Sequence, residues 1–454
     1  MELSTATHVH PSEPKVSEDE ELRAARRRLL NPTSAEFLQD PYATYALLRE
    51  RQPLCYRPRS NAWVATRYED AQAVLRDPCF GRDPEPTFEA IHGPGINDEP
   101  VVRNFNRMMI VRNDPDHSRL RKLVNASFNA RRVLSLKAAI ARIANELVDR
   151  LPASGEVDLM VDFARPLPVT VICELLGIPE ADRQRFIDRR VVSERIFVPV
   201  PLTPEELAEE NRRFLELRDY FLSLCAERRR APREDLISDL VAAKERGELD
   251  EEELIAMIAV IFNAGHDTTV NLIGNGLLAL HRHPEQLALL RARPDLMPSA
   301  VDELLRYDSS VQTSDRRALE SVELGGQRIE KGQLVVCVLG AANRDPEVYP
   351  DPDRLDITRS GTKPVAFGGG IHFCLGAQLA RIEGQIALGA LLSRLPDISL
   401  PELERPEWSP SVFLRGLETL PARYQRRLDS GFDVAATARP TGAATKATAR
   451  CPFH

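Results

Sequence analysis

The sequence predicts a mainly α-helical fold with a small β region. Two long stretches, residues 133–240 and 250–283, repeat apolar side chains at helical spacing. Four short apolar runs between residues 314 and 338 are typical of strands, because Gly325-Gly326 and Lys331-Gly332 supply turns between them. The helical stretches are far longer than the strands, so helices should form most of the structure.

Length and composition limit the class of protein. A chain of 454 residues exceeds the roughly 250–300 at which single cores stop growing, which favours two domains, yet no linker marks a boundary. Acidic residues outnumber basic ones by 68 to 60, and this net charge of −8 argues against non-specific nucleic-acid binding. The seven cysteines are unpatterned, which favours a reducing cytoplasm. The longest apolar run, 254–262, is far shorter than the ~18 residues of a membrane span, and no signal peptide is visible, so we expect no membrane association.

The first hundred residues should form short elements. Residues 1–30 are a polar extension that we expect to be partly disordered, with a helix beginning near residue 21. The pattern after residue 31 predicts a helix, a strand and a second helix over 41–48, 62–66 and 69–75. Residues 81–100 are rich in proline, glycine and aspartate, which predicts a long loop; such a loop is either functional or a plain surface excursion.

A helix begins at Asp114, which can cap it, with Pro115 in the first turn. His117 and Arg121 are four residues apart and share one face. Two potential cations on one face are suited to clamp carboxylates, but they are also what a solvated basic stripe would contain. The spacing alone leaves both interpretations open.

The helical stretch 133–240 is interrupted by the proline-rich, apolar residues 198–202. Thr203, Pro204 and Glu206 then form a capping pattern that restarts a helix. The interruption is either part of a mobile lid or an ordinary connection between helices.

The helix predicted over 250–283 would be about 50 Å long at ~1.5 Å per residue. Its first part is apolar on all sides, as in a buried helix, and polar groups then arrive together at Asp267 and Thr268. The Thr268 hydroxyl can bond back to the carbonyl of Ala264 or Gly265, bending the helix. An acid beside a hydroxyl in a buried groove is a candidate proton relay, and the alternative is that both threonines at 268–269 only satisfy local backbone groups.

A later stretch combines one helical ion pair with the short strands. Glu303 and Arg306 are three residues apart on a helix, a spacing that is common on protein surfaces. The strands should cover 314–319, 322–324, 327–329 and 334–338.

The stretch that organises the chain is the glycine-rich loop 367–376, Phe-Gly-Gly-Gly-Ile-His-Phe-Cys-Leu-Gly. Its cysteine, Cys374, stands at the entrance of a helix, where backbone N–H groups and the helix dipole favour a thiolate. Glycines let a flat ligand approach the backbone, and a thiolate beneath a planar macrocycle is how proteins ligate haem iron for O–O cleavage. A lone cysteine is more often a small buried hydrophobe, while a phosphate loop is excluded because no Gly-Lys-Ser/Thr follows.

These motifs, in this order, resemble those of the cytochrome P-450 family over residues 31–427. The resemblance implies a single domain shaped as a triangular prism, with haem b between the long helix and the cysteine loop, and an Ala/Thr-rich disordered tail over 428–454. It implies that Cys374 is the axial iron ligand and that Phe367 shields its sulfur. It also places haem against two glycines of the loop, Gly368 and Gly376. Four further residues would bind its propionates: His117, Arg121, Arg316 and His372.

The same resemblance assigns Asp267 and Thr268 to oxygen activation, and Glu303, Arg306 and Arg354 to a structural triad. It implies an enzyme, a monomeric monooxygenase that inserts one atom of O₂ into a hydrophobic substrate such as a fatty acid, a terpenoid or steroid, or a macrolide-like polyketide. The residues expected near that substrate are Phe88, Ile91, Asn263, Ala264, Ser310, Thr313 and Phe413.

The chain has no nucleotide-binding motif for a fused reductase, so an external ferredoxin with an NAD(P)H-dependent reductase should supply electrons. Its docking surface would use Lys122, Arg131 and Arg132. Two alternatives are a peroxide-driven hydroxylase and a non-enzymatic haem carrier or sensor.

Overall fold

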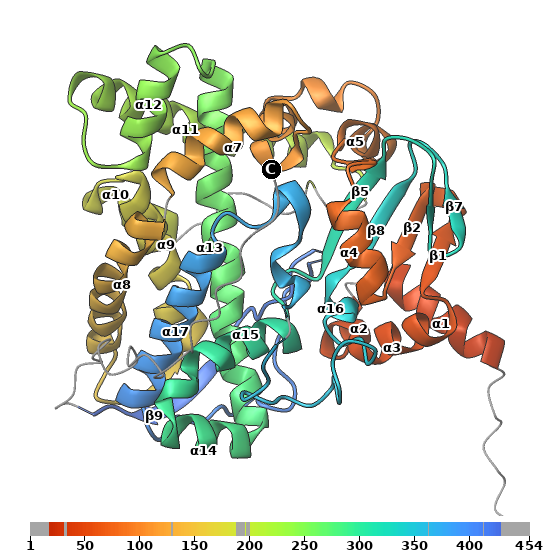
Figure 1. Ribbon diagram of the computed structural model, residues 1–454. Coiled ribbons are helices and arrows are strands. Elements are labelled where there is room, and N and C mark those ends of the chain that lie inside the picture. Colours follow the sequence, from red (N-terminus) through yellow and green to blue (C-terminus); the bar gives the residue numbers. More distant parts are fainter. Residues whose placement is uncertain are drawn as a thin grey trace, which may run out of the picture.

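The computed structural model describes residues 18–30, 34–128, 130–187, 196, 200–361, 363–411 and 413–427. The protein is mainly helical, with a small β region on one side (Figure 1). Within these ranges no helix is both long and apolar enough to cross a membrane. The tail predicted to be disordered, 428–454, lies outside the described residues.

The N-terminal part contains short elements, as predicted. They are α1 (Glu18–Leu30), α2 (Ala35–Gln39), α3 (Tyr42–Arg51), β1 (Leu54–Arg57), β2 (Ala62–Ala65), α4 (Tyr68–Arg76), β3 (Phe80–Gly81), α5 (Glu85–His92) and α6 (Pro100–Arg107). Helix α1 packs against α3, buries Ala25 and hydrogen-bonds Gln52 through Arg26. The predicted polar extension is therefore part of the fold from Glu18 onward.

Longer helices dominate the middle of the chain. The elements are α7 (Asp116–Ser127), α8 (Ala130–Arg150), β4 (Ser154–Asp158), α9 (Pro166–Leu176), α10 (Glu180–Ile187), α11 (Pro204–Arg230), α12 (Leu236–Glu245) and α13 (Glu251–Arg282). The capping box predicted at Thr203 and Glu206 is present at the start of α11. A second capping box, Asp250 with Glu253, starts α13.

The C-terminal part combines helices with most of the strands. It contains α14 (Pro284–Ala292), α15 (Met297–Tyr307), β5 (Thr313–Ala318), β6 (Val322–Leu324), β7 (Gln327–Ile329), β8 (Leu334–Val338), α16 (Leu339–Ala342), α17 (Ala377–Arg394) and β9 (Pro421–Gln425). The four strands predicted between residues 314 and 338 are all present, with the first shifted by one residue.

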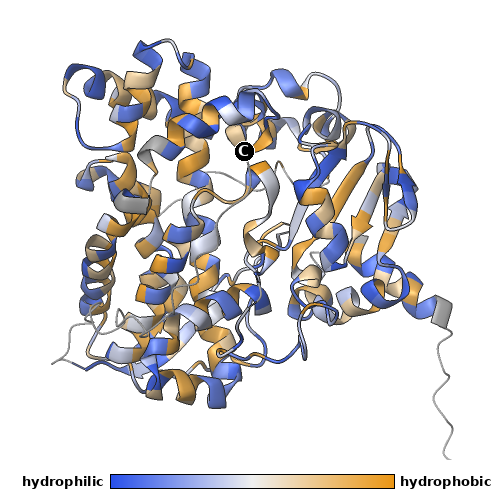
Figure 2. Ribbon diagram, in the orientation of Figure 1, coloured by the Kyte–Doolittle hydropathy of each residue, from blue (hydrophilic) through white to orange (hydrophobic). Residues whose placement is uncertain are grey.

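The main sheet has five strands in the order β1-β2-β8-β5-β3, so it joins segments that are far apart in sequence. β2 pairs with β8 in parallel, with Ala62 opposite Leu334, and β5 pairs with β3 antiparallel, with Arg317 opposite Gly81. Figure 2 shows hydrophobic stretches along β2 and β8. A separate two-stranded sheet pairs β4 with β9.

The prediction of one long loop over 81–100 is wrong. Helix α5 occupies most of its first half, and α6 begins at Pro100. Phe88 of α5 is 5 % exposed and packs edge to face against Phe105 of α6. This apolar contact accounts for the order of a stretch whose composition favours turns.

The long helix α13 runs through the centre of the molecule as one unbroken helix of 32 residues (Figure 1). It packs against α9 on one side and α17 on another. The α9 contact is very close at Gly265, where an added Cβ would lie 2.7 Å from Ile172 Cδ1. A large side chain at this position would push the two helices apart.

One buried acid should make stability depend on pH. Glu383 of α17 is 1 % exposed, its Oε2 has no hydrogen-bond partner, and burial raises its pKa well above the usual range. Below the unfolded-state pKa of about 4.3 the group is neutral in both states. Above that pH the unfolded chain releases a proton that the folded chain keeps, so the free energy of unfolding falls as pH rises towards the folded-state pKa.

We therefore expect Glu383→Gln to melt at a higher temperature than the wild type at pH 8, with a gap that closes towards pH 4.5. Melting curves at a series of pH values measure this. A difference in melting temperature between the two proteins that is the same at every pH would contradict this expectation.

Candidate active site

The cysteine loop connects two short 3₁₀ turns, Val365–Phe367 and Gly370–His372, to the start of α17. The Cys374 backbone N–H donates to the Phe367 carbonyl (3.0 Å), which closes the loop. Gly370 has φ +64°, and an added Cβ there would lie 2.2 Å from the Leu75 carbonyl oxygen of α4. Glycine is thus required at this position by both backbone conformation and space.

Burial raises the pKa of the Cys374 thiol, while the Gly376 N–H and the charges of Arg121 and Arg381 oppose that rise. The sequence argument for a thiolate identified the N–H contribution but not the larger cost of burying the charge. The protein around Cys374 therefore disfavours a free thiolate, and a bound metal cation would supply the missing counter-charge, because a coordinating thiol is deprotonated outright.

His117, which is buried beside the loop, and the partly buried His372 of the loop itself have ring nitrogens that lack partners. The rings of His117 (α7) and His372 are 4.4 Å apart. Neither nitrogen of His117 has a hydrogen-bond partner, nor does Nε2 of His372, and Asp114 Oδ1 is 3.8 Å from His117 Nδ1. Buried polar groups are normally satisfied, so these atoms indicate a polar ligand between α7 and the loop.

Cations surround the same two rings. Burial and then the charges of Arg316 and Arg82 lower the pKa of His372 to about 2. Burial, with Arg82 second, lowers the pKa of Arg316 to about 9. The pKa of Arg121 is lowered by burial. So much positive charge with few carboxylates requires an anionic ligand, and the two propionates of haem fit this requirement.

Arg316, chosen over Arg317 from the sequence, has different surroundings from its neighbour. Arg316 is 2 % exposed and belongs to the cation cluster, whereas Arg317 donates to the carbonyls of Asp83 and Gly332. Arg82 is a further cation that sequence reasoning missed. Its guanidinium pairs with Asp315 (2.9 Å), a contact that depends on the pairing of β3 with β5 and leaves no local signal.

Asp267 and Thr268 lie on α13. Thr268 Oγ1 donates to the Ala264 carbonyl (3.3 Å), which confirms one of the two predicted back-bonds. Asp267 has a side chain that is 40 % exposed, and its Oδ1 is 3.4 Å from Nε2 of His266. An acid and a hydroxyl are thus adjacent on one helix, as a proton relay needs.

The predicted triad forms with a different third member. Glu303 and Arg306 of α15 are almost fully buried and make a bidentate pair at 2.8 Å. The prediction of Arg354 is wrong: Arg359 Nε is 3.2 Å from Glu303 Oε1, while the side chain of Arg354 is exposed and its carbonyl oxygen accepts from Arg306 and Arg359. Both arginines lie in the same irregular segment, so sequence spacing could not distinguish them.

The triad connects to the cysteine loop through one asparagine. Arg306 Nη1 donates to the Asn343 carbonyl (2.9 Å), and Asn343 Oδ1 accepts from the backbone N–H of Val365 (2.8 Å). Val365 starts the turn that leads into Gly368. Phe367, the last residue of that turn, has Arg381 stacked 4.5 Å from its ring centre. The ion pairs therefore hold the loop from one side.

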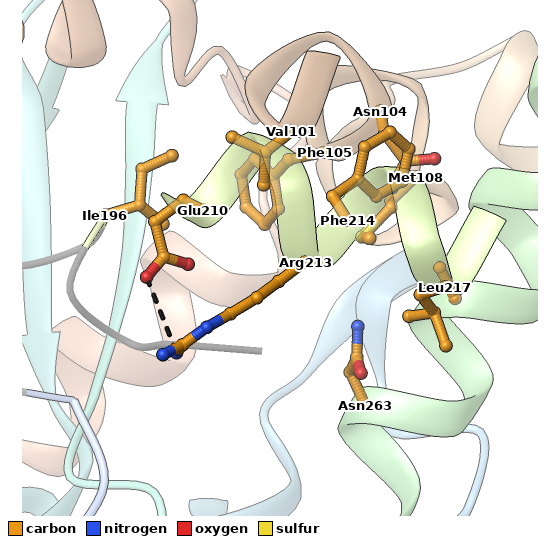
Figure 3. Close-up of a pocket in the computed structure, with 11 residues that line it drawn as sticks. Val101, Asn104, Phe105, Met108, Ile196, Glu210, Arg213, Phe214, Leu217 and Asn263 are labelled. Carbon is orange, nitrogen blue, oxygen red and sulfur yellow. Dashed lines mark ion pairs between the residues drawn. The ribbon is translucent and has the colours of Figure 1, made fainter. Parts of the chain in front are cut away.

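A pocket that is partly open to solvent lies between α6, α11 and α13 (Figure 3). Its walls are mostly apolar, with Phe105, Met108, Phe214 and Leu217 among them. Glu210 and Arg213 of α11 face each other at 4.0 Å near one end. A hydrophobic molecule with a few polar groups fits such a lining.

Of the residues predicted to contact substrate, only Asn263 lines this cavity. Phe88 and Ile91 belong to α5, and Phe88 is buried against Phe105. Ser310 is buried with an unpartnered hydroxyl. The remaining three lie on α13, in β5 and near the C-terminus: Ala264 is exposed, Thr313 pairs with Val338, and Phe413 is 39 % exposed.

The basic residues proposed for partner docking differ in their surroundings. Lys122 of α7 is exposed. Arg132 pairs with Asp239 at 2.7 Å and is not available as a free cation. The side chain of Arg131 lies outside what the structure describes.

Comparisons with known proteins point in one direction. A sequence model of the family described as cytochrome P-450 matches residues 54–414. Cytochrome P-450 107B1 of Saccharopolyspora erythraea is 42% identical over 400 residues, which covers 85% of this chain and 96% of that protein. The 6-deoxyerythronolide B hydroxylase of the same organism is 40% identical over 404 residues, covering 86% of this chain and 97% of that one. The solved structure of myxobacterial cytochrome P-450 CYP267B1 with myristic acid matches with a TM-score of 0.79 and 39% identity, over 87% of this chain and 98% of that chain.

Proposed function

The chain belongs to the cytochrome P-450 family, and from that premise we propose that it hydroxylates or epoxidises a medium-to-large hydrophobic substrate with electrons from an external ferredoxin. Members of the family are monooxygenases that hold haem b through a cysteine thiolate, and here that cysteine is Cys374. The observation that carries the proposal is the set of buried, unpartnered histidine nitrogens among cations beside Cys374.

When bound, haem supplies the activation of O₂ and its insertion into a C–H bond, and the thiolate ligand favours O–O cleavage. We assign the residues of this chain to three tasks. Cys374 would ligate iron, shielded by Phe367, while Gly368 and Gly376 would leave room for the macrocycle. His117, Arg121, Arg316 and His372, together with Arg82, would neutralise the propionates. Asp267 and Thr268 would hold and deliver protons.

The substrate should be largely apolar with few polar groups, because the cavity between α6, α11 and α13 has mostly apolar walls and one ion pair. Two relatives have names that support this class: one is a 6-deoxyerythronolide B hydroxylase and the other was solved with myristic acid. A fatty acid, a terpenoid or steroid, and a macrolide-like polyketide therefore stay the candidates.

An external donor remains part of the proposal, with Lys122 as the exposed cation of its docking surface. Peroxide-driven hydroxylation is the alternative, and the paired Asp267 and Thr268 argue against it, since peroxide already carries both electrons and protons. A carrier or sensor is disfavoured because matched relatives are named as hydroxylases.

We expect a saturable shift of the haem absorption band when the purified ferric protein is titrated with members of one substrate class. A substrate that enters the cavity displaces water near iron and changes its spin state. Myristic acid, progesterone and 6-deoxyerythronolide B are suitable probes of the three classes. The responding compound should then be oxidised with ferredoxin, reductase and NADPH faster than with hydrogen peroxide.

The opposite order of rates would establish the peroxide-driven alternative. Leu217 on the cavity wall provides a specificity control, because Leu217→Trp should weaken the shift while leaving the haem content unchanged.

A further inference from the structure

Two histidines of α13, and His283 that caps its C-terminal end, bond back to carbonyl groups of this helix. Nδ1 of His266, His281 and His283 lies 2.7, 2.8 and 2.8 Å from the carbonyl oxygen four residues earlier. A carbonyl oxygen only accepts, so each Nδ1 carries its hydrogen. His266 differs from the other two in its second nitrogen, because Nε2 faces a carboxyl group, that of Asp267.

The ring of His266 is held in place. It is 5 % exposed and lies 5.1 Å from the ring centre of Phe262, whose carbonyl also binds Nδ1. The backbone before it is fixed as well, because Gly265 touches Ile172 of α9. With Nδ1–H committed, Nε2 of the neutral ring has only a lone pair to offer.

Asp267 is the less restrained partner. Its side chain is 40 % exposed, and across the described ranges His266 is the one side chain within ion-pair distance of it, at 3.4 Å. A protonated Asp267 can donate to the Nε2 lone pair, and an ionised Asp267 attracts the protonated ring. In both of these arrangements one proton lies between Nε2 and Oδ1, and the ring then draws the carboxyl group towards one side of α13, next to Thr268; a neutral ring and an ionised carboxylate would repel each other.

We propose that His266 is a positioning residue for Asp267: it restrains the carboxyl group in the orientation from which protons reach the distal face. This inference rests on the proposed function, because it assumes that Asp267 delivers protons. It adds a residue to which the family resemblance gives no role. His266 does not itself contact the reacting atoms.

The decisive functional readout is the share of NADPH electrons that ends in hydrogen peroxide, measured with a surrogate [2Fe–2S] ferredoxin and its reductase. When protons are delivered incorrectly, hydrogen peroxide is released instead of water or product. Peroxide can form with or without substrate, so its share can be measured in both cases. We expect Asp267→Asn to slow proton-dependent turnover about 100-fold and His266→Phe about tenfold, both with a larger peroxide share. His266→Phe keeps a ring against Phe262 and removes both nitrogens.

The double variant separates a positioning role from an independent one. If His266 acts only through Asp267, His266→Phe with Asp267→Asn should behave as Asp267→Asn alone. Additive losses would overturn the proposal. His283→Phe is the matched control, since it removes the same back-bond at the far end of α13 and should leave the peroxide share unchanged.

A second readout does not depend on turnover. In the diamagnetic ferrous carbonyl form, ¹⁵N spectra of ring-labelled histidine report which nitrogen carries hydrogen. The signals that disappear in His266→Phe belong to His266. In the wild type they should show a hydrogen on Nδ1, and the Nε2 signal should shift in Asp267→Asn. A hydrogen on Nε2 alone, or an Nε2 resonance indifferent to residue 267, would refute the contact.

The assignment of Asp267 as proton donor and the positioning role of His266 would be contradicted by different results. Should Asp267→Asn leave the peroxide share unchanged, its assignment as proton donor is wrong, whatever the spectra show. Should Asp267→Asn raise the share and His266→Phe not, the proton donor stands and only the positioning role is lost.

Discussion

Replacing Glu303 by alanine should lower the free energy of unfolding by about 3–5 kcal/mol, because it leaves two arginines without their shared carboxylate in the interior. Arg306 is 1 % exposed, and its pair with Glu303 is bidentate. Arg359 loses its contact with Glu303 Oε1, and the backbone N–H of Asp356 loses the same acceptor. Against a total stability of about 5–15 kcal/mol the change is large.

The effect should extend to the haem site. Since Arg306 holds Asn343, which holds Val365, the variant should purify with less haem and melt at a lower temperature. Arg359→Ala should show a weaker form of the same defect. Arg354→Ala serves as the matched control and should change stability by less than about 0.5 kcal/mol, because only its backbone oxygen is used. Equal losses in the two arginine variants would contradict the assignment of Arg359.

Replacing Cys374 by serine should abolish monooxygenation while leaving most haem bound. Of the cations around His117 and His372, only Arg121 interacts with the sulfur, so binding of the propionates by the others should persist. A serine hydroxyl does not ionise as readily as a thiol and cannot supply the electron density that favours O–O cleavage. Loss of a residue that only hydrogen-bonds a metal ligand lowers metal affinity or activity about 10–100-fold. Loss of the ligand itself should therefore lower the activity by more than about 100-fold.

Two measurements test this. The absorption band of the ferrous carbon monoxide complex should move to the position of a haem without thiolate, and product formation should fall with it. Cys79→Ser is the control, since Cys79 lies at the edge of the main sheet and pairs with Glu320. An unchanged band in Cys374→Ser would mean that another residue ligates iron.

The sequence was sufficient where a signal is local. The capping box at Thr203, the long helix that ends at Arg282, and the back-bond of Thr268 all depend on residues within a few positions of each other. The cysteine loop is equally local, because its glycines and Cys374 lie within ten residues.

What failed depended on contacts between distant segments. Arg82 joins the cation cluster through the pairing of β3 with β5, more than two hundred residues later. Arg359 rather than Arg354 reaches Glu303 because of how an irregular segment folds over α15, which no periodicity encodes. Helix α5 forms against α6 in spite of a turn-rich composition, and only the packing of Phe88 on Phe105 explains it.

The pairing of β4 with β9 sets the order in which the nascent protein can be completed. Ser154 lies opposite Gln425, so the early strand must wait until the residues of β9 have been synthesised. Cys374 follows 373 other residues. Haem capture therefore comes after most of the described fold has been synthesised, and the apolar walls of an empty haem site must be kept from aggregating until then.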